Sequence, residues 1–220
     1  MSYMKLIQQN KWISLILLAV AFSLIYNPLT KFPFTFCVII VFILITAYLQ
    51  NGSLKELNFK KLNFHDVKII LISYLTLELG VDFFVQPLIN WLCNEPADYS
   101  TFEHIKGDAF QYFKWLFSMW ISAAIGEELL FRAFAFAQLK NVFGEKKGFI
   151  VLISSLMFCL PHLYQGVAGL IMTFIFGIVF ALLYMKYQNI WVNIIIHGLI
   201  DSVFLTLSYF GYIEFYQFMW

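Results

Sequence analysis

Two adjacent glutamates and an arginine interrupt an apolar run that is long enough to cross a lipid bilayer. They are Glu127, Glu128 and Arg132, and each charge costs about 2.5–3.5 kcal/mol at the centre of a bilayer. On a helix, Glu128 and Arg132 lie four residues apart on the same face, where they can form a bidentate ion pair. Glu127 points about 100° away around the helix. The spacing therefore predicts that Arg132 neutralises Glu128 and leaves Glu127 free to act.

The composition is that of a membrane protein. Hydrophobic residues make up 61% of the chain and charged residues 12%, whereas soluble domains average about 45–50% and 25%. The net charge of +1 argues against nucleic acid as a partner. Cys37, Cys93 and Cys159 form no motif, so a disulfide framework is not expected. The first apolar run, Trp12 to Ile25, lacks a small-residue cleavage site and is predicted to be a retained span.

The apolar segments predict an all-α fold, a polytopic bundle of about seven transmembrane helices that forms a single integral membrane domain over residues 1–220. A span needs roughly 20 apolar residues to cross about 30 Å of hydrocarbon. Nothing in the sequence sets an oligomeric state. The expected spans are 12–26, 34–50, 67–90, 110–139, 149–163, 167–186 and 189–210.

The lysines between these spans predict the orientation in the bilayer. Lysine and arginine are enriched in the short loops that stay in the cytoplasm. With seven spans, almost all lysines in or next to loops fall on one side, and we expect a multi-pass protein of the cell membrane with its N-terminus in the cytoplasm and its C-terminus outside. The lysines on the expected cytoplasmic side are Lys5, Lys11, Lys55, Lys60, Lys61, Lys68, Lys140, Lys146, Lys147 and Lys186.

Further ionisable residues lie inside the last spans. Asn193, His197 and Asp201 recur every four residues and form one polar stripe on a helix. At 1.5 Å per residue, Glu127 lies about 18 Å from the cytoplasmic end of its span, and His162, His197 and Asp201 lie about 20, 12 and 18 Å from the cytoplasmic ends of theirs. Residues from separate helices are thus expected to meet at a similar depth, as a buried site requires.

Each of these groups also has a structural explanation. A lone membrane histidine commonly bonds to a neighbouring helix, and a glutamate–arginine pair can serve only to hold helices together. Glu78 and Asp82 share a face and are better explained by lining a wet cavity or pairing with Lys114 than by catalysis. Cys159, three residues before His162, suggests a thiol nucleophile, but such spacing in apolar surroundings is weak evidence.

The order of these motifs on separate spans resembles that of the CAAX-protease and bacteriocin-processing (CPBP, or Abi) family of intramembrane proteases. The resemblance covers about residues 110–205 and implies a helical membrane fold with endopeptidase activity on a peptide or protein. It also implies a role in peptide processing or in bacteriocin self-immunity. The matching motifs are Glu127-Glu128-x-x-x-Arg132, Phe158-x-x-x-His162 and His197-x-x-x-Asp201.

The resemblance implies a role for each matched residue. Glu127 would polarise a catalytic water together with His162. His197 and the residue four positions beyond it would stabilise the oxyanion of the tetrahedral intermediate. Glu128 and Arg132 would support the site.

Asp201 departs from the eukaryotic members of this family, which have asparagine at the corresponding position. An ionised aspartate cannot donate a hydrogen bond to an oxyanion. Asp201 would instead orient His197 and hold it charged, or would itself be protonated.

A metal mechanism is the chemical alternative. Glu127, His162 and His197 could hold Zn²⁺ with one open position, so that a metal-bound water would be the nucleophile. The chain has no His-Glu-x-x-His pair, so the spacing alone does not predict a metal site. We favour a glutamate-activated water and leave the metal requirement open.

Two classes of protein without peptidase activity remain as rivals. One is an immunity or interaction protein that keeps the family fold without catalysis. The other is a small transporter or proton relay, which would favour polar residues spread across the whole depth of the bilayer.

Overall fold

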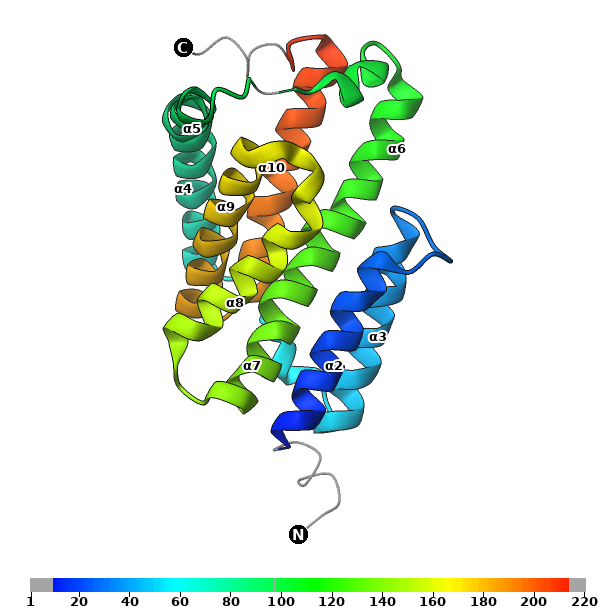
Figure 1. Cartoon of the computed structure of the whole chain (residues 1–220), viewed down its shortest axis with the longest axis vertical. Coiled ribbons are helices and arrows are strands. Elements are labelled where there is room, and N and C mark those ends of the chain that lie inside the picture. The colour runs from blue at the N-terminus through cyan, green and yellow to red at the C-terminus, as the bar shows by residue number, and fades with distance from the viewer. Residues whose placement is uncertain (1–9, 97, 214–220) are drawn as a thin grey trace.

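The structure, a computed structural model, describes residues 10–96 and 98–213. Within these ranges the chain is a bundle of helices and contains no strand (Figure 1). The first helix begins at the lower end of the bundle in this view, and the last helix ends at the upper end. The expected all-α membrane bundle is therefore confirmed.

The helices follow the order and approximate limits that hydropathy predicts. A hairpin of two helices comes first, and the fourth segment is one long helix whose middle is wound more widely than an α-helix. Two short 3₁₀ turns, η2 (Lys55–Leu57) and η4 (Ser100–Ile105), lie in the longer loops. The segments are α2 (Lys11–Ser23) with η1 (Leu24–Tyr26), α3 (Phe34–Asn51), α4 (Phe64–Gly80) with η3 (Val81–Val85) and α5 (Gln86–Cys93), α6 (Ala109–Met119) with η5 (Trp120–Phe134) and α7 (Ala135–Phe143), α8 (Lys147–Cys159) with η6 (Leu160–Gln165), α9 (Gly166–Tyr187) and α10 (Ile190–Phe210).

Four helical stretches in the described part of the chain are long and apolar enough to cross a membrane. They are Phe34–Asn51, Phe64–Cys93, Lys147–Tyr187 and Ile190–Phe210. The third of these folds back on itself, because α8 packs against α9, so it contains two of the expected spans. The helix from α6 to α7 carries the glutamates and the arginine, whose charge lowers its hydropathy. Lys11–Tyr26 is apolar but shorter.

Short polar side chains determine where several helices begin. An Asn or Asp carbonyl or carboxylate oxygen accepts a hydrogen bond from a backbone N–H that the first turn leaves unpaired. Asn10 accepts from the N–H of Trp12, and Asn189 from that of Trp191. Asn63 accepts from the N–H of Asp66, whose carboxylate in turn accepts from the N–H of Asn63. These polar caps therefore mark where helices begin, which the apolar sequences alone would not define.

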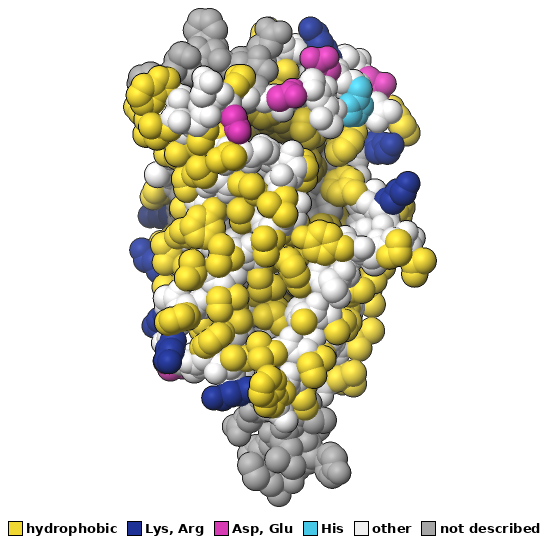
Figure 2. All heavy atoms as spheres, viewed as in Figure 1, with side chains coloured by type: hydrophobic (Ala, Val, Ile, Leu, Met, Phe, Trp, Pro, Cys, Tyr) yellow, Lys and Arg dark blue, Asp and Glu magenta, His cyan; other side chains and the backbone are white. Residues whose placement is uncertain are grey.

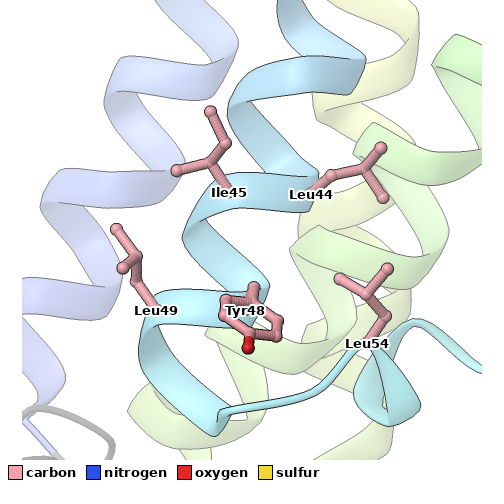
Figure 3. A pocket seen from close by; sticks show the side chains of 5 residues that line it. All are labelled: Leu44, Ile45, Tyr48, Leu49 and Leu54. Carbon is pink, nitrogen blue, oxygen red and sulfur yellow. The ribbon is translucent and has the colours of Figure 1, made fainter.

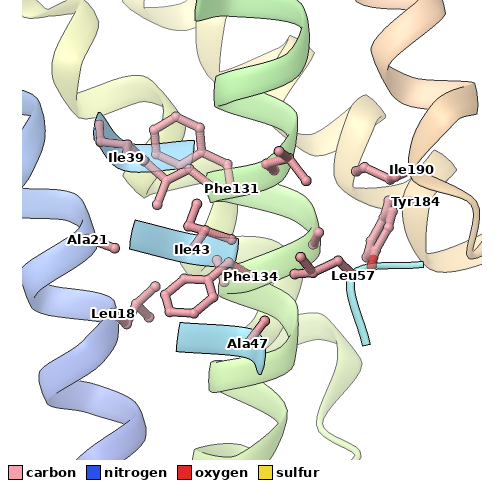
Figure 4. Packing of buried hydrophobic residues seen from close by; sticks show 14 of the residues in the cluster. Leu18, Ala21, Ile39, Ile43, Ala47, Leu57, Phe131, Phe134, Tyr184 and Ile190 are labelled. Atoms are coloured by element: carbon pink, nitrogen blue, oxygen red, sulfur yellow. The ribbon is translucent and has the colours of Figure 1, made fainter. Parts of the chain in front are cut away.

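The largest apolar core lies where α3 passes between α2 and the long helix containing η5 (Figure 4). Ile39 and Ile43 of α3 are completely buried there, facing Phe131 and Phe134 of η5 on one side. A second core joins α4, α9 and α10. The two cores place η5 and α10 at the centre of the molecule, in contact with each other.

The surface agrees with a membrane environment. In Figure 2, hydrophobic side chains cover the middle of the visible face, and most of its acidic side chains lie at the upper end. Large apolar side chains such as Ile16, Ile72, Phe113 and Phe117 are more than half exposed, which lipid tolerates and water does not. The protein is therefore a membrane protein.

We expect labelling from the two sides of the membrane to follow the lysine pattern. Lys60 and Lys106 are exposed in loops that contact opposite ends of α10. In a background whose three cysteines are replaced by serine, Lys106→Cys should react with a membrane-impermeant maleimide in intact cells. Lys60→Cys should react only after permeabilisation. The reverse pattern would contradict the predicted orientation.

Candidate active site

The two glutamates and the arginine lie in η5, the widely wound part of the long helix. At its end, the N–H of Ala135 donates to the carbonyl of Leu130, five residues earlier, in the manner of a π-helix. Ser154 on α8 donates its hydroxyl to the carbonyl of Phe131 at 2.6 Å, so a neighbouring helix supports this backbone. Turns of the π type are uncommon and often occur at functional sites.

Glu128 is the centre of a buried polar network. Its Oε1 lies 3.0 Å from Nη1 of Arg132, so the ion pair that the spacing predicts is present, through this contact and not in a bidentate form. The same oxygen lies 2.9 Å from Nδ1 of His197, and Oε2 accepts a hydrogen bond of 3.1 Å from Nδ2 of Asn193. Glu128 therefore joins η5 to α10 as well as neutralising Arg132.

Arg132 is completely buried and faces two aromatic rings. Its guanidinium carbon lies 4.2 Å from the ring centre of Phe158 and 5.3 Å from that of Phe180. Among the described residues, its nitrogens have no well-directed hydrogen bond, so the contact with Glu128 is an ion pair set by distance. A desolvated cation over an aromatic ring is stabilised by about 2 kcal/mol or more, which offsets part of the cost of burial.

His197 lies between two carboxylates. Its Nδ1 is at hydrogen-bond distance from Glu128, whereas its Nε2 is 3.9 Å from Oδ2 of Asp201. The imidazole ring packs on Phe180, with 5.2 Å between ring centres. Asp201, which was expected to orient His197, is therefore one of two carboxylates that contact this ring. Glu128 makes the close contact, and Asp201 approaches the other nitrogen at ion-pair distance.

Glu127 lies beside this network without being bound into it. It is close enough to His197, Asp201 and Arg132 to interact with them electrostatically. Among the described residues, no hydrogen bond or ion pair holds its carboxylate, and its side chain is partly exposed. The carboxylate that the sequence predicts to be unpaired therefore has no hydrogen bond or ion pair from the described residues.

His162 stands slightly apart from the others. It lies in η6 just after Pro161, where its backbone leaves helical geometry with φ −97° and ψ 15°. Its Nδ1 is 2.9 Å from the carbonyl of Phe158, to which it donates when that nitrogen is protonated. The ring of Phe158 contacts the rings of both His162 and His197, so the two histidines face a common aromatic residue.

The predicted zinc ligands do not form a metal-binding group in this arrangement. Within the described ranges, no three His, Cys, Asp or Glu side chains are placed to hold a metal ion. Glu127, His162 and His197 share a region without converging on one point. The zinc alternative stays a prediction, and no chemical step below passes through a metal.

Two other expectations concern residues outside this network. Cys159 donates its thiol to the carbonyl of Leu170 at 3.3 Å, so it belongs to the contact between α8 and α9. Asp82 makes no ion pair with Lys114 among the described residues. The hydroxyl of Tyr99, near Asp82, accepts a hydrogen bond of 2.7 Å from Gln86.

Trp120 is a site neighbour that the sequence did not single out. Its indole N–H donates to the hydroxyl of Ser202 at 3.0 Å. Its ring also covers Gly198, where an added Cβ would come within 2.6 Å of it. Trp120 thus contacts α10 at the residues immediately after His197 and Asp201. The sequence feature that could have indicated this close approach is Gly198, a glycine that follows the polar residue His197 in an apolar helix.

A surface hollow lies away from this network. It is formed by Leu44, Ile45, Tyr48 and Leu49 of α3 together with Leu54 (Figure 3). Its lining is apolar except for the tyrosine hydroxyl, so it has no group suited to hydrolysis.

Comparison with known proteins identifies the segment that carries the site. Residues 109–203 match the family model described as type II CAAX prenyl endopeptidase Rce1-like. The chain is therefore similar to the Rce1-like family over this segment. The segment contains η5, η6 and most of α10, and it agrees with the range over which the motifs resemble the CAAX-protease family. Comparisons with curated proteins and with solved structures found no match.

Proposed function

We propose that this protein is a CAAX-protease-type intramembrane endopeptidase in which Glu127 activates a water molecule. The observation that carries the proposal is the position of Glu127. Its carboxylate has no partner among the residues that the structure describes, and it lies beside His197, within an apolar bundle and within the segment that matches the Rce1-like model. A base next to a donor in a low-dielectric site is what peptide hydrolysis needs.

The proposed reaction uses Glu127 as a base and then as an acid. The carboxylate takes a proton from water while the water oxygen attacks the carbonyl carbon of the peptide. The carbonyl electron pair moves to oxygen and forms an oxyanion. When the oxyanion collapses, the C–N bond breaks and the proton on Glu127 passes to the departing amine.

His197 is the proposed donor to the oxyanion. In its protonated form, Nδ1–H donates to Glu128, and Nε2–H is left on the side where Asp201 lies. Arg132 and Asn193 hold Glu128 in place, so the ring has a set orientation before substrate arrives. Asp201 balances the charge of the imidazolium and does not itself donate to the oxyanion.

His162 is the proposed second contact for the water. Donation of Nδ1–H to the carbonyl of Phe158 leaves Nε2 as an acceptor. We expect His162→Ala and His197→Ala each to lower kcat by about 10²–10³-fold, the usual range for loss of one acid–base or oxyanion group. His104→Ala, at an exposed histidine in η4, should retain wild-type kcat. Activity of the His197 variant equal to that of the His104 variant would contradict the assignment.

Peptidomics of membranes tests the function without assuming a substrate. Membranes from cells that express the wild type should contain cleavage products that are missing with Glu127→Gln. A farnesylated peptide ending in Cys-Val-Ile-Met and its unmodified form are the first purified probes, because the matched family is one of prenyl endopeptidases. Identical peptide profiles for wild type and variant would refute the proposal.

The same variant separates the rival functions. Processing of an exported peptide or self-protection by cleaving a bacteriocin would both be lost in Glu127→Gln. A non-catalytic immunity protein would keep its phenotype. A transporter or proton relay would carry ion flux in proteoliposomes, which the endopeptidase would not.

A further inference from the structure

Helix α3 lies outside the segment that matches the family model, yet it packs along η5. Its contact with η5 includes the residue immediately before Glu127. That residue is Gly126, which is buried against the side chain of Phe36 near the start of α3. A contact from outside the matched segment therefore lies one residue from the proposed base.

Phe36 lies so close to Gly126 that there is no room for a side chain at position 126 of η5. A Cβ at position 126 would come within 2.6 Å of Cδ1, 2.9 Å of Cβ and 3.0 Å of Cγ of Phe36. Rotation of the aromatic ring can move Cδ1 but not Cβ, which is attached directly to the backbone. Relief would therefore require α3 and η5 to move apart.

Helix α3 is held firmly in this position. Ile39 and Ile43 are completely buried between α2 and η5 (Figure 4). Towards the other end of α3, Gln50 and Gln138 are buried and form amide hydrogen bonds of 2.9 and 3.5 Å between α3 and α7. An unpaired buried amide is costly, so these bonds resist sliding of the two helices. Phe36 therefore packs against η5 from a helix whose own position is fixed.

The position of the Glu127 carboxylate depends on the η5 backbone more than the position of the Glu128 carboxylate does. Glu128 is held by Arg132, Asn193 and His197, whereas no hydrogen bond or ion pair from the described residues holds the Glu127 carboxylate. The location of the Glu127 carboxylate must then follow from where the η5 backbone lies. On the α3 side, the contact nearest to Glu127 along this backbone is Phe36 against Gly126.

We propose that Phe36 is a positioning residue for Glu127, and that its contact with Gly126 sets the distance between the Glu127 carboxylate and the α10 side chains. This inference rests on the proposed function. Displacement of a catalytic group by about 1 Å can lower a rate by about 10²-fold. Substrate binding depends less on this displacement, so kcat should change more than KM.

A size-compensation experiment tests this role with the farnesylated Cys-Val-Ile-Met peptide as substrate. Gly126→Ala should lower kcat by about 10–100-fold and change KM by less than about threefold. In a Phe36→Gly background, which removes the Cβ of Phe36 as well as its ring, the same substitution should change kcat by less than about threefold, because contacting residues are not additive. An equal effect of Gly126→Ala in both backgrounds would overturn the proposal.

Two matched controls separate positioning from general damage. Gly148→Ala adds a methyl group on α8 where no heavy atom lies within 4 Å. Phe34→Ala removes a phenyl ring from the same helix at a position that is 67% exposed. Both should keep wild-type kcat. Equal losses in Phe34→Ala and Phe36→Ala would also overturn the proposal.

A second measurement does not depend on the peptide. Dicyclohexylcarbodiimide reacts with carboxyl groups in apolar surroundings, and its rate of reaction at Glu127 can be followed by mass spectrometry. Gly126→Ala should change this rate by at least about threefold, and the change should disappear in the Phe36→Gly background. Unchanged rates would refute the inference. Glu127→Gln run alongside separates the two claims. If Glu127→Gln cleaves the peptide at the wild-type rate, the proposed function is refuted. If Glu127→Gln is inactive while Gly126→Ala and Phe36→Ala are fully active, only the positioning role is refuted.

Discussion

Replacement of Glu127 by glutamine is expected to lower kcat for peptide cleavage by about 10²–10⁴-fold, the contribution typical of a positioned acid–base group. Glutamine keeps the size and shape of the side chain but cannot take a proton from water. The Glu128–Arg132 pair and the Glu128–His197 contact do not involve Glu127, so the fold should survive. The measurement is the steady-state rate in detergent or proteoliposomes.

The matched control is Glu103→Gln, which removes a carboxylate from the exposed η4 turn. It should keep the wild-type rate. Size-exclusion profiles and thermal transitions of both variants should match those of the wild type. Retained cleavage by Glu127→Gln would show that another group activates the water.

Replacement of Arg132 by methionine is expected to cost about 3–5 kcal/mol of stability, because it leaves the carboxylate of Glu128 buried without its cation. Methionine has a similar length and can still pack between Phe158 and Phe180. Unfolding in mixed micelles by titration with sodium dodecyl sulfate gives the difference in free energy. Lys140→Met, which breaks the exposed pair with Glu145, should be indistinguishable from wild type.

The double variant Glu128→Gln/Arg132→Met tests the reason for that loss. Glutamine removes the unpaired charge and keeps one oxygen, which can accept the hydrogen bond from His197. We expect the double variant to recover at least half of the stability that Arg132→Met loses, because removing both charges costs less than stranding one. A double variant that is less stable than Arg132→Met would contradict this account.

Local patterns in the sequence predicted the helices and one of the polar contacts. The spans follow from hydropathy, which depends only on neighbouring residues, and their limits agree with the described helices within a few residues. The pairing of Glu128 with Arg132 follows from an i,i+4 spacing on one helix. The order of the motifs also located the family segment, because the matched range 109–203 nearly coincides with the expected range 110–205.

Contacts between helices could not be predicted in the same way. Spacing placed Asp201 on the same face of α10 as His197, and the two do approach to 3.9 Å. The hydrogen-bond partner of His197 is Glu128, 69 positions earlier. The rotation of α10 relative to η5 decides this, and no local pattern encodes that rotation. The π-type winding of η5 and the packing of Gly126 against Phe36 also depend on neighbouring helices.

The sequence by itself determined that this chain is a helical membrane protein and which charged residues must find partners inside it, because burying a charge in lipid is costly wherever the helices lie. Only the tertiary structure decided which partners they find on other helices. Helix packing placed Glu128 within reach of Asn193 and His197, in addition to Arg132 on its own helix, and left Glu127 beside them without a hydrogen bond from the described residues. The difference arises because hydropathy is a property of single segments, whereas distances between side chains on separate helices are set by how those helices pack.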